Sequence, residues 1–466
     1  MESKKTRREF LKRSSLAIAG VTIGQKGFPI VDRDNRIMGA NDRVRTGFIG
    51  VGNRGSQLLH GFMAQPDCEV AALCDVYKPY VIRDYSQVEP RYIKEIGRIP
   101  KMGENFPRSV KQFEDYRKLL EDKSIDAVCI STPDHWHALQ TIDSIQAGKD
   151  VYVEKPLSKT IAEGRKMVEI GNKSKQIVSV GLNRRSAPTF QKLAGEIPAG
   201  KIGKITFAQA CHVSNMFPNG IGKQESEPPP SNFNWDMWLG PRSYRPYQYN
   251  IAPYMFRWWE DYANQISNNG IHYLDLIRWL IDEEAPIAVS AHGGKFVIDD
   301  DRTIPDTMHV TYEFGSGILV TISILETSSG SFIPFGFLEL RGTNGTLYTG
   351  ENDYKIVPAK AGQFQTWKEL IQAEEYNLKK DNPAIGNSYK DSTTSHIRNF
   401  LDCVKSREQP SATLEIGHRS TTLAHLGTIA MQTRKRLEWD GLKERFTNCN
   451  EANSYLSYEY REPWKI

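Results

Sequence analysis

A glycine-rich segment near the start of the chain has the residue types needed to bind a dinucleotide. Gly50-Val51-Gly52-Asn53-Arg54-Gly55 matches the G-x-G-x-x-G pattern and directly follows an apolar run, 44–49. Between a strand and a helix, Gly50 allows a tight turn, Gly52 lets a pyrophosphate approach, and Gly55 lets the helix pack closely. The first helical N–H groups, around Asn53 and Arg54, would then bind the phosphates. The alternative is a glycine-rich turn in an unrelated α/β domain.

A carboxylate stands where the ribose of such a cofactor would lie. Asp75 ends a second apolar run, 70–74, twenty residues after Gly55. A carboxylate at this place accepts hydrogen bonds from the adenosine ribose hydroxyls and repels a 2′-phosphate. We therefore predict NAD rather than NADP, although the nearby cations Lys78 and Arg54 weaken this choice.

Lys155 has the type and position expected of an acid–base catalyst. It lies between Glu154 and Pro156, directly after an apolar run at 150–153. A lysine at a strand end beside a bound nicotinamide is partly desolvated, which lowers its pKa toward neutrality. A solvated surface lysine is the alternative, but the strand-end position favours the functional interpretation.

These residues require a parallel sheet whose carboxyl edge brings them together. Apolar runs and helical patterns alternate over 44–181, which predicts a doubly wound Rossmann sheet with ligands at the carboxyl ends of its strands. Alternating runs then follow over 202–340 and predict a large open, mostly antiparallel sheet. The expected fold class is α/β with a second α+β domain. The expected divisions are 1–40 as signal and linker, 41–182 as the cofactor domain, and 183–466 as the substrate domain with C-terminal helices.

The order of three motifs resembles the Gfo/Idh/MocA family of NAD(P)-dependent oxidoreductases, which includes inositol and glucose dehydrogenases and glucose–fructose oxidoreductase. The motifs are the glycine pattern, Thr132-Pro133-x-x-x-His137 and Glu154-Lys155-Pro156. The resemblance implies that Lys155 is a catalytic or substrate-positioning lysine. It also implies that Thr132, Pro133 and His137 line the nicotinamide side. We add Glu154 and Asn183, which follow the fifth and sixth predicted strands, to the cofactor-binding residues.

The same resemblance points to a histidine in the second domain. Many members carry Asp-x-x-x-His on a helix, and the matching residues here are Asn268 and His272. Residues four apart share one helical face, so both would point into one cleft. His272 would be the general base that removes the alcohol proton. Because Asn268 replaces the usual acid, the proton relay would depend more on Lys155; a buried core histidine is the alternative, and Asp275 is expected to be structural.

An aromatic segment and several polar residues are candidates for substrate binding. The segment 215–262 is rich in Trp and Tyr, whose planes suit the apolar faces of pyranose rings; aromatics that merely pin a long loop are the alternative. Candidate contacts to substrate hydroxyls or carboxylates are Arg184, Arg185, His212, Tyr254 and Arg257. The six cysteines show no CxxC spacing, and we predict no metal site.

The N-terminal residues account for the positive charge of the chain. The 466 residues carry a net charge of +4, but the first forty contain nine basic and four acidic residues, which leaves −1 for the remainder. Arg7 and Arg8 precede Phe-Leu-Lys and a short apolar run, 14–24, which resembles a twin-arginine export signal. A disordered basic tail is the alternative. The mean hydropathy of −0.51 excludes a polytopic membrane protein, and the charge distribution indicates no nucleic-acid partner.

These features together lead to an expected function. We expect an exported, periplasmic sugar or glycoside oxidoreductase, carried folded by the twin-arginine machinery, without stable membrane insertion, and active as a homo-dimer or homo-tetramer. Export away from the cytoplasmic cofactor pool implies tightly bound NAD and a redox-neutral cycle, with oxidation at C3 as the specific case. The alternatives are an NAD-dependent glycosidase that works by oxidation, elimination, hydration and reduction, and a non-catalytic NAD-binding sensor. The tail, 455–466, is expected to be an arm that reaches a neighbouring subunit.

Overall fold

A computed structural model describes residues 43–364 and 366–466, which contain two β-sheets. The predicted export signal, at residues 1–40, lies outside the described residues. In the described part of the chain, no helix has both the length and the apolar character needed to cross a bilayer.

The first sheet is fully parallel and has the strand order β3-β2-β1-β4-β5-β6. Its strands are β1 (Val44–Ile49), β2 (Cys68–Cys74), β3 (Lys111–Phe113), β4 (Ala127–Ile130), β5 (Asp150–Val153) and β6 (Val178–Val180). The order changes direction between β1 and β4, so the loops after these two strands border a crevice at the carboxyl edge. The doubly wound parallel sheet predicted from the sequence is confirmed.

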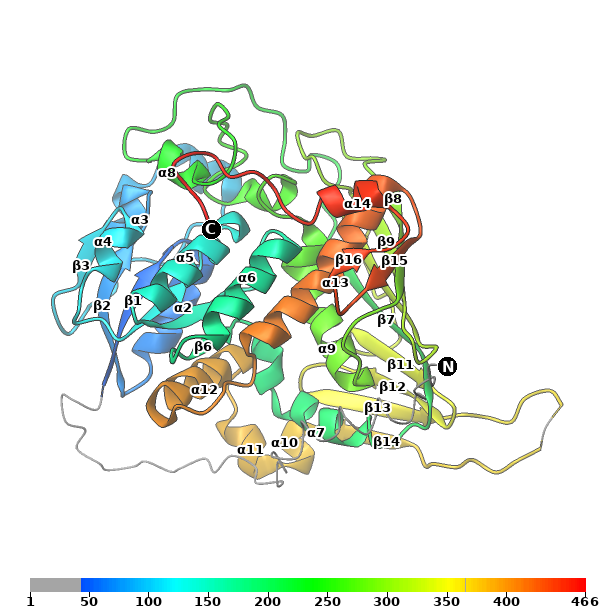
Figure 1. The fold of residues 1–466 in the computed structure, drawn as a ribbon. Helices are drawn as coiled ribbons and strands as arrows, with labels where there is room; N and C mark the ends of the chain where they lie inside the picture. Colours follow the sequence, from blue (N-terminus) through cyan, green and yellow to red (C-terminus); the bar gives the residue numbers. More distant parts are fainter. Residues whose placement is uncertain (1–42, 365) are drawn as a thin grey trace, which may run out of the picture. The chain divides into compact units, whose positions relative to one another are not determined.

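Helices cover both faces of this sheet, which explains why its strands read as continuous apolar runs (Figure 1). Phe48 and Tyr152 pack toward α2 (Asn53–Met63) and α12 (Ser392–Ser406). On the opposite face lie α4 (Tyr116–Leu120), α5 (Asp134–Gln146) and α6 (Ile161–Asn172). Helix α12 comes from the far end of the chain, and its Phe400 ring lies 6.1 Å from Phe62.

The second sheet has ten strands in the order β14-β13-β12-β11-β7-β10-β9-β8-β15-β16. These are β7 (Ile205–Val213), β8 (Ala288–Gly294), β9 (Thr307–Glu313), β10 (Leu319–Leu325), β11 (Leu338–Gly342), β12 (Gly345–Thr349), β13 (Asp353–Pro358), β14 (Glu374–Asn377), β15 (Leu437–Asp440) and β16 (Arg445–Phe446). All neighbours are antiparallel except β7 and β10. The predicted mostly antiparallel sheet is therefore confirmed.

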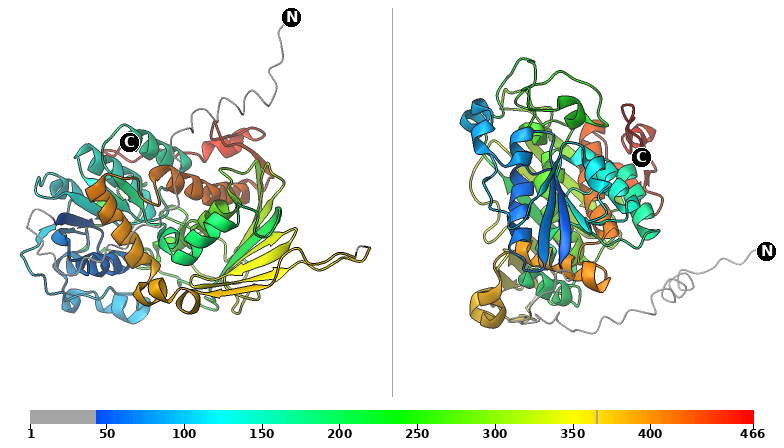
Figure 2. Two further views of the ribbon diagram at one scale, coloured as in Figure 1. Left: turned by 90° about the horizontal axis from the view of Figure 1, so that it is seen from below. Right: turned by 90° about the vertical axis from the view of Figure 1, so that its left-hand side faces the viewer.

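One face of the second sheet packs on helices (Figure 2). Val310 and Ile322 pack with α7 (Pro188–Glu196), α9 (Ile271–Ile281) and α13 (Leu414–Thr433) in one core. The opposite face carries half-exposed side chains such as Thr311 and Thr321. The alternation follows from the two-residue period of a strand with one buried face.

Short elements complete the described chain. They are α3 (Lys78–Ile82), η2 (Tyr85–Gln87), η3 (Tyr92–Ile96), η4 (Asn183–Ser186), α8 (Trp235–Leu239), η5 (Met255–Trp258), η6 (Ile266–Gly270), α10 (Leu378–Asp381), α11 (Pro383–Ser388) and α14 (Asn450–Ser454).

The C-terminal tail packs on its own chain, and its predicted contact with a neighbouring subunit stays a prediction. The Trp464 ring lies 4.8 Å from Trp136 on α5, and the Tyr460 hydroxyl donates to Glu163 on α6 at 2.5 Å. The tail aromatics therefore find buried partners within the subunit.

Candidate active site

The glycine turn joins β1 to α2 and shapes one wall of a cleft. Gly50 has a φ of 82°, and a Cβ there would meet the Thr132 backbone nitrogen at 2.8 Å. A Cβ on Gly55 would lie 2.1 Å from the Gly50 carbonyl oxygen, because α2 packs directly on the turn. At Gly52, the nearest atom to an added Cβ would belong to Tyr80, at 3.5 Å. The turn thus leaves room for a diphosphate at the N-terminus of α2.

Asp75 stands after β2 and faces the same cleft. Its carboxylate accepts hydrogen bonds from the backbone N–H groups of Val51, at 2.8 Å, and Tyr77, at 2.9 Å. Burial raises the pKa of Asp75 to about 6, so the group is still largely charged at neutral pH. Lys78 is exposed and Arg54 pairs with another carboxylate, so neither cation offsets Asp75 in the described chain. The charged Asp75 carboxylate therefore still favours NAD over NADP.

A cavity lies at the carboxyl edge of the first sheet; we call it the cofactor cleft. Nine predicted cofactor residues line it: Gly50, Gly52, Asn53, Arg54, Asp75, Thr132, Pro133, Glu154 and Lys155. Asp134, which the sequence analysis did not select, also lines the cleft, and burial raises its pKa.

Two other predicted cofactor residues support the cleft from behind. Gly55 permits the contact between α2 and the turn, and the buried His137 lies beneath the lining. The two ring nitrogens of His137 lie 2.9 Å from the Thr132 carbonyl oxygen and 2.7 Å from that of Pro156. His137 therefore links the turn after β4 to the turn after β5 and positions Thr132 and Lys155.

A second cavity adjoins the first and shares part of its lining. The predicted residues that line it are Asn53, Arg54, Lys155, Asn183, His212, Tyr254, Arg257, Asn268 and His272. Asn183 was predicted to bind the cofactor, yet it lies on this side. Six residues line both cavities: Asn53, Arg54, Lys155, Tyr254, Arg257 and Asn268. A cofactor in the cleft and a small molecule in the second cavity would thus meet beside Lys155.

The Lys155 amine is held by amide oxygens at this junction. Its Nζ donates to the Asn268 backbone oxygen at 2.6 Å and to Asn268 Oδ1 at 3.1 Å. Burial lowers the pKa of Lys155 to about 8, against the opposing attraction of Glu154 and Asp134. Glu154 itself accepts from Arg54 at 2.8 Å. The amine can therefore gain or lose a proton near neutral pH.

Asn268 and His272 come from one continuous helical segment and line the same cavity, as their spacing predicted. Asn268 lies in the π-helical turn η6, which leads directly into α9, where His272 is the second residue. Burial and the nearby Lys155 hold the pKa of His272 well below its usual value, so the imidazole is neutral. Its buried Nδ1 has no hydrogen-bond partner among the described residues. The His272 side chain as a whole lines the second cavity, although this nitrogen is enclosed by the protein.

The two arginines after β6 lie outside both cavity linings. Arg185 is buried and pairs with Asp275, Nη2 to Oδ1, at 2.8 Å, which confirms the structural role expected of Asp275. The Arg184 guanidinium stacks on Tyr273 at 4.9 Å and on Phe337 at 4.2 Å. The structure therefore does not bring Arg184 or Arg185 to the cavity linings, where a contact with substrate was predicted.

The aromatic segment has two roles that the sequence left open. Trp235 stacks on Trp238 with ring centroids 4.8 Å apart, and most neighbouring rings are buried, so these residues pin the loop. Trp238 and Tyr254 also line the cofactor cleft, whereas Tyr254 and Trp258 line the second cavity.

A buried polar network behind the second cavity was missed by sequence reasoning. Trp258 Nε1 donates to both carboxylate oxygens of Glu326 at 3.0 Å, and Arg302 Nη1 donates to Glu326 at 2.7 Å. Arg302 also pairs with Asp300 at 3.0 Å. This network fixes the Trp258 indole plane against the cavity wall.

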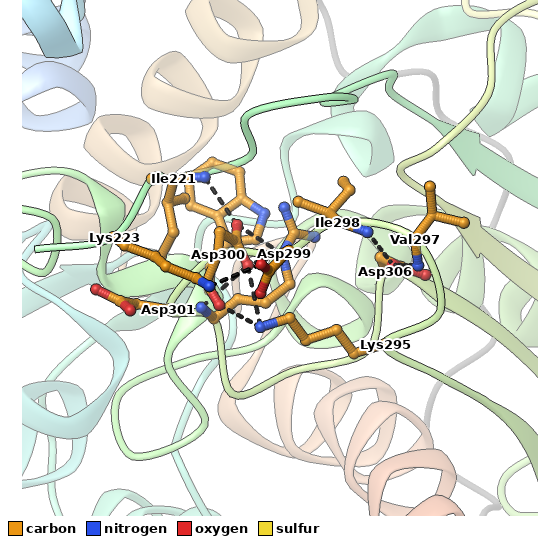
Figure 3. Close-up of polar contacts among 12 residues, drawn as sticks. Ile221, Lys223, Lys295, Val297, Ile298, Asp299, Asp300, Asp301 and Asp306 are labelled. Carbon is orange, nitrogen blue, oxygen red and sulfur yellow. Dashed lines mark hydrogen bonds and ion pairs between the residues drawn. The ribbon is translucent and has the colours of Figure 1, made fainter.

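The loop that supplies Asp300 shows why this network was hard to predict. Figure 3 shows Asp300 facing the Ile221 backbone N–H, at 2.8 Å, while Asp299 reaches Lys223 at 2.7 Å. In the sequence, Asp299-Asp300-Asp301 reads as a solvated acidic turn. Among residues 43–364 and 366–466, no group of three or more His, Cys, Asp or Glu side chains could hold a metal ion.

Two family models match most of the chain. The Gfo/Idh/MocA oxidoreductase family, NAD-binding Rossmann fold, matches residues 44–182, and the C-terminal α/β domain of the same family matches residues 244–439. The chain belongs to the Gfo/Idh/MocA oxidoreductase family. Most of the residues that line its cofactor cleft belong to the part of the chain that matches the NAD-binding Rossmann domain of that family.

Relatives of this Gfo/Idh/MocA protein carry names from carbohydrate chemistry. A glycosyl hydrolase family 109 protein of Shewanella pealeana is 28% identical over 46% of this chain and 47% of its own length. The match thus spans about half of that relative. A myo-inositol 2-dehydrogenase of Thermotoga maritima is 23% identical over 85% of this chain and 98% of its own.

A solved structure supports the fold assignment of the Gfo/Idh/MocA chain. A levoglucosan dehydrogenase in complex with NADH and levoglucosan has a TM-score of 0.61 and 16% identity, and covers 85% of this chain and 99% of its own. At this identity the likeness concerns the fold.

Proposed function

We propose that this protein is an exported NAD-dependent sugar or glycoside oxidoreductase that oxidises a ring hydroxyl, with C3 as the specific case. The observation that carries the proposal is the placement of Lys155, Asn268 and His272 where the cofactor cleft meets the second cavity. The dehydrogenases among its relatives and structural neighbours favour a polyhydroxylated substrate.

The residues of the cleft suit NAD. The open side of Gly52 and the N-terminus of α2 would hold the diphosphate, and Asp75 would accept the ribose hydroxyls. When bound, the nicotinamide accepts a hydride from a carbinol carbon and can return it to a carbonyl.

The chain supplies the proton chemistry. The neutral Lys155 amine accepts the hydroxyl proton, while the Asn268 oxygens hold the amine in place and stabilise the ammonium that forms. His272, whose neutral side chain lines the second cavity, binds the same hydroxyl or relays its proton. Trp258 offers an indole plane to an apolar sugar face.

The proposed location and cofactor retention rest on the sequence of residues 1–40. Their basic and apolar pattern suits a twin-arginine signal and a periplasmic enzyme that is exported folded with NAD inside. Such an enzyme needs a redox-neutral cycle, in which a second carbonyl compound reoxidises the cofactor. The half-exposed face of the second sheet suits a homo-dimer or homo-tetramer.

Two measurements test the proposal. The purified protein, once denatured, should release NAD(H), and sugars or glycosides should reduce the bound cofactor, seen as nicotinamide absorbance. Lys155→Met should lower this rate by about 100-fold or more, as loss of a general base does. Lys166→Met, on the exposed face of α6, is the control. Turnover that survives Lys155→Met would refute the assignment.

A second candidate is an NAD-dependent glycosidase, favoured by the glycosyl hydrolase name of the Shewanella relative. Its cycle would begin with the same oxidation and would then eliminate the aglycone, add water and reduce the sugar. Aryl glycosides separate the two reactions, since hydrolysis frees the phenol and oxidation alone leaves it attached. A protein that binds NAD but converts none of these compounds would be the non-catalytic sensor instead.

A further inference from the structure

The second cavity has an excess of positive charge. Of the side chains that line it, four are basic and one is acidic: Arg54, Arg98, Lys155, Arg257 and Glu326. His212 and His272 add no charge, because burial lowers the pKa of each ring.

Ion pairs within the chain neutralise two of these five groups. Arg54 pairs with Glu154 at 2.8 Å, and Glu326 pairs with Arg302 at 2.7 Å. Arg98, Lys155 and Arg257 have no carboxylate within 4.0 Å in the described chain, residues 43–364 and 366–466. Asp134 attracts Lys155 and Arg257 from the cofactor cleft without forming an ion pair to either.

The Arg257 guanidinium is held in an orientation that allows it to bind an anion. Its Nη1 donates to the Tyr254 carbonyl oxygen at 2.7 Å, and its guanidinium stacks on the Tyr254 ring at 4.3 Å and on Phe256 at 4.7 Å. A guanidinium fixed on rings keeps its outer N–H groups free for a bidentate oxyanion. Burial lowers the pKa of Arg257, and the positive charge of Arg98, which lines the same cavity, adds to this effect.

We propose that the sugar substrate of the second cavity carries an oxyanion group, a carboxylate or a sulfate or phosphate ester, which Arg257 and Arg98 bind. This inference rests on the proposed function and names its substrate class. Arg257 is half-buried and Arg98 is exposed, and an anion that binds both would supply the carboxylate-like partner that neither has within the described chain. The cofactor diphosphate has its own place at the glycine turn, and Arg98 lines the second cavity but not the cofactor cleft.

Matched sugars test the proposal on the full-length protein. Methyl glucuronide, methyl glucoside 6-sulfate and methyl glucoside 6-phosphate are each compared with neutral methyl glucoside, by reduction of bound NAD. We expect kcat/KM for at least one anion to exceed that for the neutral glycoside by about 10-fold or more, as a charge-assisted hydrogen bond provides. The best of the three identifies the oxyanion.

Variants then assign the preference to the two arginines. Arg257→Gln and Arg98→Gln should each reduce the preference for the anion, with a smaller fall for the neutral glycoside. Arg108→Gln is the control, because Arg108 is exposed and pairs with Glu69. Equal kcat/KM for neutral and anionic sugars would overturn the proposal. So would an Arg257→Gln protein in which NADH binding weakens as much as anion recognition.

Calorimetry separates this inference from the proposed function. Glucuronate, sulfate and phosphate are titrated into the NAD-loaded protein and into its Arg257→Gln variant. Binding that the variant loses supports the anion site even if no sugar is oxidised, in which case the proposed function fails alone. Oxidation of neutral sugars with no binding of any anion leaves the proposed function standing and overturns the anion site.

Discussion

The Lys155 amine is held by two amide oxygens of Asn268 rather than by a carboxylate. An acid in place of Asn268 would stabilise the ammonium and raise its pKa. With the amide, burial dominates and the pKa falls to about 8. The substitution thus moves the lysine into the range where it exchanges protons.

The lowered pKa of Lys155 predicts that the rate of sugar oxidation depends on pH. Below pH 8 the amine is protonated and cannot accept the hydroxyl proton, so the rate of sugar oxidation should rise about tenfold per pH unit and level off above about pH 8. The reverse reduction, which needs the ammonium, should fall above the same pH. Single-turnover reduction of bound NAD between pH 6 and 9.5 measures the profile. An unchanged rise in Lys155→Met would assign the pKa to another group.

Because Arg185 and Asp275 form a buried ion pair, we expect that breaking this pair lowers the stability of the protein and does not change substrate binding. Arg185→Met leaves the buried Asp275 carboxylate unpaired, which should lower the free energy of unfolding by about 3–5 kcal/mol. Arg185→Met combined with Asp275→Leu should recover most of this loss. Urea denaturation measures both variants. A raised KM with unchanged stability would instead show that Arg185 contacts substrate.

At the scale of elements, the first sheet could be predicted because its signals are local. The glycine turn, Asp75, Thr132 and Lys155 each follow an apolar run directly, so their place at one sheet edge follows from the parallel order. The network of Trp258, Glu326 and Arg302 could not be predicted, because its members come from separate loops.

The contact between α2 and the glycine turn gives a prediction at this scale. Gly55→Ala would place a Cβ 2.1 Å from the Gly50 oxygen, which forces α2 off the turn. We expect a loss of about 1–3 kcal/mol in stability together with loss of retained NAD. Gly195→Ala, at an exposed position of α7, is the control and should be neutral or stabilising by up to about 1 kcal/mol. Full NAD retention by Gly55→Ala would contradict this role of the turn.

At the scale of the molecule, the C-terminal tail ties together parts that are distant in the sequence. It runs past α8, where the Arg461 N–H donates to the Pro241 oxygen at 2.9 Å, and ends against α5. The hydrophobic pattern indicated an aromatic tail but could not tell an internal partner from a neighbouring subunit, because both offer apolar surface.

Removal of residues 455–466 should therefore destabilise the subunit. The truncation exposes Trp136 and leaves the buried Glu163 without the Tyr460 hydroxyl. We expect the free energy of unfolding to fall by about 3 kcal/mol or more, seen as a lower Tm in calorimetry. Glu459→Ala, an exposed change in the same tail, should stay within about 0.5 kcal/mol. A truncated protein with unchanged Tm would show that the tail contributes no stability.

Helix α12 also constrains the order in which the protein can be made. The Phe400 ring covers the rings of Phe62 and Tyr152, and its centroid lies 6.1 Å and 5.8 Å from theirs. A nascent chain that has just left the ribosome up to β6 would still present these rings to water, and to chaperones. The N-terminal sheet therefore reaches its final packing only after more than two hundred further residues have been synthesised, and NAD can be enclosed in a finished cleft only then.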